Sequence, residues 1–178
     1  MFSMDILETN RLILRQFTFQ DTIFIIELLN SPGWLEFIGD RNVKTHKEAK
    51  AYLLNGPIKS YAENGFGLGL VKTKNDNTTI GMCGLIKRDE LEYPDIGFAF
   101  LPGWSGKGYA YEIAEAVMEY AENQLGLPAV LAITTAANNS SIKLLVKLGL
   151  KFLKIISFPG KEEELMLFSK SFAREEKE

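Results

Sequence analysis

Hydrophobic residues recur along the chain at two spacings, one typical of helices and one typical of strands. The clearest helical pattern covers residues 110–125, where four glutamates lie outside the apolar stripe and Gly126 and Pro128 follow it. The stripe consists of Ala110, Ile113, Ala114, Val117, Met118, Ala121 and Leu125. We therefore predict a long amphipathic helix over 110–125 that packs on a core along one face.

Strand-like patterns lie on both sides of this helix. Residues 129–135 form a nearly unbroken apolar run, which is typical of a strand buried on both faces. Short connections between the candidates from residue 66 to residue 101 favour antiparallel pairing. In all, strands are predicted at 11–15, 66–72, 79–86, 95–101, 129–135, 151–158 and 164–172.

Capping residues indicate shorter helices in the first third of the chain. Asp21 is a candidate cap for a helix that ends at 30–33, and a loop is expected over 34–43. Thr45 and Glu48 form a capping-box pattern, so a second helix is predicted to start there and to continue, with an interruption, as far as residue 61.

A further short helix is predicted to follow a cap at Asn138 or Asn139 and to end at Gly149. Its apolar residues are Ile142, Leu144, Leu145 and Leu148. About seven strands and about four helices in this order indicate an α/β (α+β) layer architecture. The length of 178 residues suits a single domain, 1–178.

Composition narrows the possible functions. The formal net charge of −3 argues against a nucleic-acid binder and against binding to an anionic membrane surface, and no apolar run is long enough to span a membrane. One cysteine, Cys83, permits no internal disulfide and fits a reducing, cytoplasmic compartment. With a single histidine, His46, a Cys/His metal site is not expected, and neither residue is predicted to be catalytic.

The segment most informative about chemistry is 101–110, which joins a strand to the long helix. Its glycines permit backbone conformations in which several N–H groups converge, and the positive end of the helix dipole lies behind them. Such a nest binds phosphate, and Lys107 adds a charge. The alternative is a tight connection that needs glycine only for its geometry. Two known phosphate loops are excluded, because Gly108 follows Lys107 and Tyr111 stands where the dinucleotide fingerprint has glycine.

The run Ser105-Gly106-Lys107-Gly108-Tyr109-Ala110 resembles the acetyl-CoA pyrophosphate loop of the GNAT acetyltransferase superfamily, with Ser105 in place of the usual Gln or Arg. Three other segments resemble that family in order along the chain, and the first of them resembles the branch of ribosomal-protein N-terminal acetyltransferases. These segments are 7–15, 95–101 and 138–150.

The resemblance implies a mixed, mostly antiparallel sheet that opens between strands 95–101 and 129–135 to admit acetyl-CoA. The backbone of Phe98, Ala99, Phe100 and Leu101 would pair with pantetheine, and a bulge in this strand is common in the family. An N–H near 98–100 would stabilise the oxyanion, and the amine would attack acetyl-CoA directly. Asn138 and Ser141 would also contact the cofactor.

Two carboxylates are candidates for the general base that deprotonates the amine. Asp95, acting through water, is the first candidate and Glu92 the second. The alternative is that Asp95 only starts a strand and pairs with Arg88. Many relatives protonate the departing thiolate with a tyrosine, but the corresponding position is Leu145, which leaves Ser141 either as a contact of the sulfur or as a helix-stabilising residue.

Acceptor binding is assigned to Trp34, Arg41 and Arg88, of which Arg41 suits a carboxylate or carbonyl. The leading hypothesis is an N-acetyltransferase that uses acetyl-CoA and no metal, acts on a small amine or a protein N-terminus, and is a monomer or homodimer. A non-catalytic acetyl-CoA-binding module and a loop for a different phosphate ligand remain alternatives.

Overall fold

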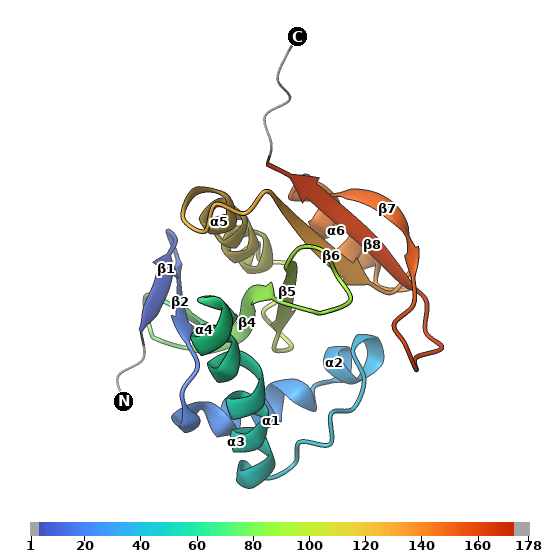
Figure 1. The fold of residues 1–178 in the computed structure, drawn as a ribbon. Coiled ribbons are helices and arrows are strands. Elements are labelled where there is room, and N and C mark those ends of the chain that lie inside the picture. The colour runs from blue at the N-terminus through green and yellow to red at the C-terminus, as the bar shows by residue number, and fades with distance from the viewer. Residues whose placement is uncertain (1–3, 173–178) are drawn as a thin grey trace.

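The computed structural model describes residues 4–172, which form one sheet covered by helices on both faces (Figure 1). The sheet has eight strands in the order β1-β2-β3-β4-β5-β6-β8-β7, and only the β5–β6 pair is parallel. The strands are β1 (Asp5–Glu8), β2 (Leu12–Gln16), β3 (Leu68–Thr73), β4 (Thr79–Ile86), β5 (Asp95–Phe100), β6 (Ala129–Thr134), β7 (Lys151–Ile156) and β8 (Leu165–Ser171). The mostly antiparallel sheet is confirmed, and all seven predicted strands are present.

The eighth strand is β1, which pairs with β2 as an antiparallel hairpin at one edge of the sheet. It is short, and only its two middle residues are half-buried, so its apolar pattern is weak. At the opposite edge β8 lies between β6 and β7, which leaves β7 exposed along most of its length.

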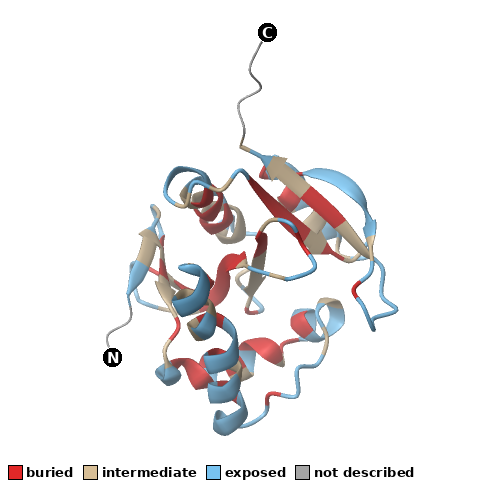
Figure 2. Cartoon of the chain, in the orientation of Figure 1, coloured by how far each residue is buried: buried red, intermediate tan, exposed pale blue. Residues whose placement is uncertain are grey.

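Helices divide the core into two layers, one on each face of the sheet. One layer packs β2, β4 and β6 against α5 and α6, and the other packs α1, α2 and α3 against Leu70 and Met82. Figure 2 shows the buried stripe of α5 facing the sheet. The helices are α1 (Thr22–Leu29), α2 (Pro32–Phe37), α3 (His46–Leu53), α4 (Lys59–Asn64), α5 (Tyr109–Asn123) and α6 (Asn139–Lys147), with a 3-10 turn at Phe19–Asp21 and a π turn at Leu54–Ile58 between α3 and α4.

Two local predictions were wrong, the second only in part. The loop expected over 34–43 begins with α2, because Pro32 suits a first helical position and Trp34 is buried against the α1–α3 layer. Asp21 does occupy the predicted N-cap position of α1, but its side chain makes no capping hydrogen bond to the helix. Its carboxylate instead accepts hydrogen bonds from Arg15 at 2.9 and 2.7 Å and from the Thr18 N–H at 2.8 Å.

Other local predictions are confirmed. The capping box of Thr45 and Glu48 starts α3. Cys83 is a buried thiol on β4, and its burial raises its pKa to about 12, which is inconsistent with a nucleophile. His46 is exposed, with Nδ1 2.8 Å from the Thr22 hydroxyl.

No helix among residues 4–172 is long and apolar enough to cross a membrane.

Candidate active site

Strand β5 has one edge that is largely unpaired, and this edge is the centre of the candidate site. Along its other edge β5 pairs with β4 without interruption from Asp95 to Phe100, so the bulge common in the family is absent from this pair. Its only partner residue on β6 is Leu131, opposite Asp95. Beyond that point the two strands diverge (Figure 1).

The pairing with β4 shows which backbone groups of β5 remain available. Antiparallel residues bond alternately to the two sides, and the Leu101 N–H donates to the Ile80 carbonyl at 2.9 Å. Ala99 therefore also faces β4, whereas the N–H and C=O groups of Phe98 and Phe100 point to the open side. The structure narrows the predicted pantetheine contacts of 98–101 to Phe98 and Phe100.

A cleft of about 510 Å³ occupies the opening between β5 and β6. Its walls come from both core layers, since Trp34 and Met82 belong to one layer and Leu145 to the other. The cleft therefore passes through the sheet. It brings together seven of the residues predicted from sequence, namely Trp34, Arg41, Arg88, Asp95, Phe98, Asn138 and Ser141.

Asp95 lies on the wall of this cleft and is 1% exposed. Arg88 Nε donates to its Oδ1 at 2.8 Å, so the predicted ion pair is present. Burial raises the pKa of Asp95, and the opposing charge and hydrogen bond of Arg88 only partly offset that rise. Glu92, the second candidate base, is exposed and does not line the cleft.

The residues predicted to bind the acceptor differ in how far their side chains are buried and fixed. Trp34 is buried and its Nε1–H donates to the Gly39 carbonyl at 3.1 Å, so it is a fixed wall. Arg41 is exposed and lies where the cleft meets a shallow groove of about 780 Å³ beside α3 and α4. The groove and the cleft share Arg41, Tyr52, Leu68 and Ile86. The cleft and the groove are therefore continuous at these residues.

The N-terminus of α6 forms another part of the cleft. Asn138 caps this helix, because its Oδ1 accepts the Ser141 N–H at 3.2 Å. The Ser141 hydroxyl makes no hydrogen bond to the described residues. The Oδ1 of Asn138 is thus already used in capping the helix, whereas the Ser141 hydroxyl is available to a ligand.

Thr135 was not predicted from the sequence. It lines the cleft just after β6, and its hydroxyl is the one buried side-chain N or O atom within residues 4–172 that lacks a partner. A buried hydroxyl without a partner is costly, which makes this atom a candidate ligand contact. No sequence pattern marks it, because a threonine at the end of a strand is common.

The glycine loop follows β5 and leads into α5. Gly106 and Gly108 have φ of +74° and +80°, a region that favours glycine, and Gly108 is the N-cap of the 15-residue helix α5. The N–H groups of Ser105 to Ala110 donate to no group within the described residues. A Cβ at Gly106 would meet nothing within 4 Å, so space is open in front of the loop.

Arg11 braces this loop from the β1–β2 hairpin, and its contribution was also missed. Its Nη1 donates to the Lys107 carbonyl at 3.2 Å, and its guanidinium lies 4.2 Å from the centre of the Tyr109 ring. Glu112 holds Arg11 in place by accepting from its backbone N–H at 2.8 Å and its Nε at 2.6 Å. These contacts join residues about 100 positions apart, which a motif cannot reveal.

These features fit coenzyme A. The loop offers unpaired N–H groups at a helix N-terminus for a diphosphate, and the open edge of β5 offers amide partners for pantetheine. Strand β5 links the loop to the cleft, and five residue steps along a strand span about 17 Å. The extended pantetheine arm of coenzyme A can cover a distance of that order. The unpartnered Thr135 hydroxyl lies at the cleft end.

Comparisons with known proteins agree with this geometry. Residues 11–151 match the family model described as Acetyltransferase (GNAT) domain. The Bacillus subtilis protein named uncharacterized N-acetyltransferase YoaA is 30% identical over 146 residues, which are 81% of each chain.

Two solved structures have the same fold. The ribosomal-protein-S5-alanine acetyltransferase of Vibrio fischeri superposes with a TM-score of 0.77 at 19% identity, covering 96% of this chain and 97% of that one. RimL, a ribosomal L7/L12 α-N-protein acetyltransferase in complex with coenzyme A, gives 0.79 at 12% identity, covering 94% and 98%. With its sequence match, its splayed sheet and its glycine loop, this chain belongs to the GNAT acetyltransferase family and is an acetyl-CoA-dependent N-acetyltransferase.

Proposed function

We propose that this enzyme acetylates a primary amine by direct attack in a ternary complex, and that the amine is the N-terminus of a polypeptide or a small molecule. The observation that carries the proposal is the position of Asp95, which lies in the cleft at the start of the open edge of β5. A carboxylate and unpaired backbone donors therefore share one strand, where an amine and a thioester can meet.

The glycine loop and β5 position the cosubstrate in this proposal. The N–H groups of Gly106 to Ala110 bind the diphosphate, with Arg11 and Lys107 adding positive charge. Acetyl-CoA supplies the acetyl group as a thioester that the amine attacks directly. A backbone N–H at Phe98 or Phe100 stabilises the negative charge that develops on the thioester oxygen.

Asp95 is the proposed general base, through a water molecule. An α-amine with a pKa of about 8 is neutral in roughly one molecule in ten at pH 7, whereas a lysine side chain with a pKa of about 10.4 is neutral in about one in a few thousand. Asp95 accepts the proton released on attack, and its raised pKa makes it a stronger base than an exposed carboxylate.

The leaving thiolate is stabilised by hydroxyl groups in this proposal. Leu145 is fully buried at the position where many relatives carry tyrosine. Ser141 and Thr135 both line the cleft without side-chain partners in the described structure. A thiol with a pKa near 8.5 is a good leaving group, so hydrogen bonding without a strong acid is sufficient.

The groove beside α3 and α4 favours an extended acceptor over a compact one. It continues from the cleft at Arg41 and is lined by charges of both signs, including Lys87 and Asp89. Among the neighbours of known structure, some are named for ribosomal-protein substrates and one for spermidine, so the fold accommodates both kinds of acceptor.

Binding and turnover together test the proposal. Calorimetry with acetyl-CoA should show binding, and a thiol-release assay with a panel of peptides with free N-termini and small amines should show turnover with at least one acceptor. The same peptides with blocked N-termini are the control and should be inactive. Tight binding without turnover across the panel would favour the non-catalytic module, and no binding would contradict the cosubstrate site.

A further inference from the structure

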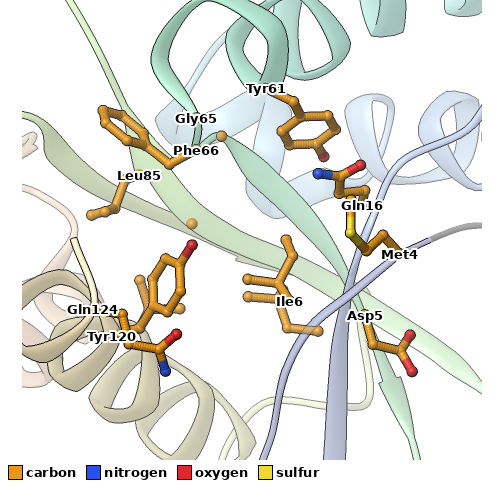
Figure 3. Close-up of a pocket in the computed structure, with 14 residues that line it drawn as sticks. Met4, Asp5, Ile6, Gln16, Tyr61, Gly65, Phe66, Leu85, Tyr120 and Gln124 are labelled. Atoms are coloured by element: carbon orange, nitrogen blue, oxygen red, sulfur yellow. The ribbon is translucent and has the colours of Figure 1, made fainter.

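A second cavity, of about 270 Å³, lies on the α5 side of the sheet. It is enclosed by β1, by the turn between α4 and β3, and by the C-terminal half of α5 (Figure 3). None of its lining residues belongs to the acetyl-transfer cleft. On β4, Leu85 lines the second cavity and the groove beside α3 and α4, whereas Ile86 lines that groove and the cleft.

Two glycines line this cavity at a point where segments of backbone approach closely. Gly67 and Gly84 form part of its floor, and a Cβ at Gly84 would lie 2.3 Å from the Gly67 carbonyl oxygen. Tyr61 closes one end as a fixed wall, because its hydroxyl accepts the Phe17 N–H at 3.0 Å and donates to the Leu68 carbonyl. The cavity is therefore bounded by groups whose own positions are fixed.

Three polar side chains converge on this cavity without partners. The side-chain amides of Gln16 and Gln124 and the hydroxyl of Tyr120 make no hydrogen bond to any described residue. Gln124 is exposed and the other two are half-buried, so all three can exchange water for a ligand. Figure 3 shows Tyr120 pointing into the cavity from α5, with Gln124 beside it and Gln16 across from it. The remaining walls are largely apolar, with Ile6 and Leu85 among them. A few convergent polar groups on apolar walls are the usual composition of a small-molecule site.

Size and charge define the class of ligand. A cavity of about 150 Å³ holds one benzene ring, so this one accommodates a single ring with a short polar head. No lysine, arginine or histidine lines it, and Asp5 is its one charged lining residue. An anionic head would find no counter-charge, whereas amides and amines can bond to glutamine and tyrosine side chains.

We propose that this cavity is a second binding site, for a small amphipathic molecule with an aromatic or branched aliphatic body and an uncharged or cationic hydrogen-bonding head. The site shares no lining residue with the cleft in which acetyl transfer is proposed. The site does not depend on which amine the enzyme acetylates.

Three probes of one shape test the class of ligand: benzamide, benzylamine and benzoate. Each is titrated into isotopically labelled protein without acetyl-CoA, and NMR shifts are followed at Tyr120 and Gln124. Benzamide and benzylamine should bind in the millimolar range or tighter with shifts at both residues, and benzoate should bind at least about tenfold more weakly. Equal binding of benzoate, or shifts confined to the cleft around Phe98, would overturn the proposal.

Two variants test the polar contacts. Tyr120→Phe and Gln124→Leu should each weaken benzamide binding by about fivefold, the loss of one hydrogen bond. Tyr111→Phe is the matched control on the same helix, because its hydroxyl bonds to Glu115 outside the cavity. Unchanged affinity in both test variants, with melting temperatures that show they are folded, would show that these groups form no site.

Discussion

The two ends of the active site are built in different ways. The proposed cosubstrate end is one contiguous segment, 101–110, whose chemistry comes from backbone N–H groups and from three glycines with positive φ. The proposed acceptor end is assembled from side chains on α2, on the segment between β4 and β5 and on the segment between β7 and β8. Only the first kind of site leaves a readable pattern in one stretch of sequence.

This difference also separates the two aspects of function. A backbone cradle recognises a diphosphate whatever the neighbouring side chains are, so it suits a cosubstrate common to a family. Side chains from three separate segments can each change without disturbing the loop. We therefore expect substitutions at the acceptor end to change the choice of amine while acetyl-CoA binding persists.

The largest expected effect lies between the two ends, at Asp95. Asp95→Asn should lower kcat by about 10²–10⁴-fold, because the proton acceptor is lost. The pKa of Asp95 is raised, so its base form increases as pH rises through that value. The variant should therefore show a flatter rise of rate with pH, measured by initial rates from pH 5 to 9.

Stability is the control for this variant. The pKa of this carboxyl group is higher in the folded protein than in the unfolded protein. Ionisation of the group therefore lowers the free energy of unfolding once the pH exceeds the unfolded-state pKa. The neutral amide should thus leave the melting temperature at neutral pH unchanged or raise it. If Asp95→Asn retains activity with an unchanged pH profile, Asp95 is not the general base and its role is the ion pair with Arg88.

The next largest effect is expected at the cosubstrate end. Gly108→Val should raise the acetyl-CoA KM by about 10–100-fold, because a β-branched residue at φ +80° costs about 1–3 kcal/mol and displaces the backbone N–H groups proposed to bind the diphosphate. Its Cβ would also lie 3.4 Å from Arg11. The KM of the acceptor should hardly change.

Gly126→Val provides the matched control for Gly108→Val, since Gly126 follows the other end of α5 with φ of +62° and has open space around it. It carries similar backbone strain far from the loop. An equal rise of the acetyl-CoA KM in both variants would attribute the effect to strain and not to the phosphate cradle.

The smallest effect is expected at the acceptor end. Arg41→Gln should raise the acceptor KM by about tenfold or less, because Arg41 is exposed and its contacts are screened by solvent. The acetyl-CoA KM should stay the same. Lys47→Gln, on the exposed surface of α3, is the control, and a matching change there would mean that the effect comes from net charge.

The sequence predicted the strand order along the chain and the long helix, since both depend on local apolar periodicity. It did not predict α2, because a six-residue helix that starts with Pro and Gly looks like a turn until Trp34 is seen to be buried. Arg11 and Thr135 were missed for a different reason. Their roles come from contacts across the fold, with α5 for Arg11 and with the cleft wall for Thr135, and such contacts follow no spacing in the sequence.

The divergence of β5 and β6 has a consequence for the lifetime of the protein. One backbone pairing, at Asp95 and Leu131, joins strands β1–β5 to strands β6–β8, so the sheet is two half-sheets that share a narrow seam. A molecule that bonds along the seam ties the halves together, and at 100 times its dissociation constant it stabilises the folded state by about 2.7 kcal/mol. If acetyl-CoA binds along this seam as proposed, we expect the resistance of the enzyme to unfolding and proteolysis to rise with the concentration of its acetyl donor.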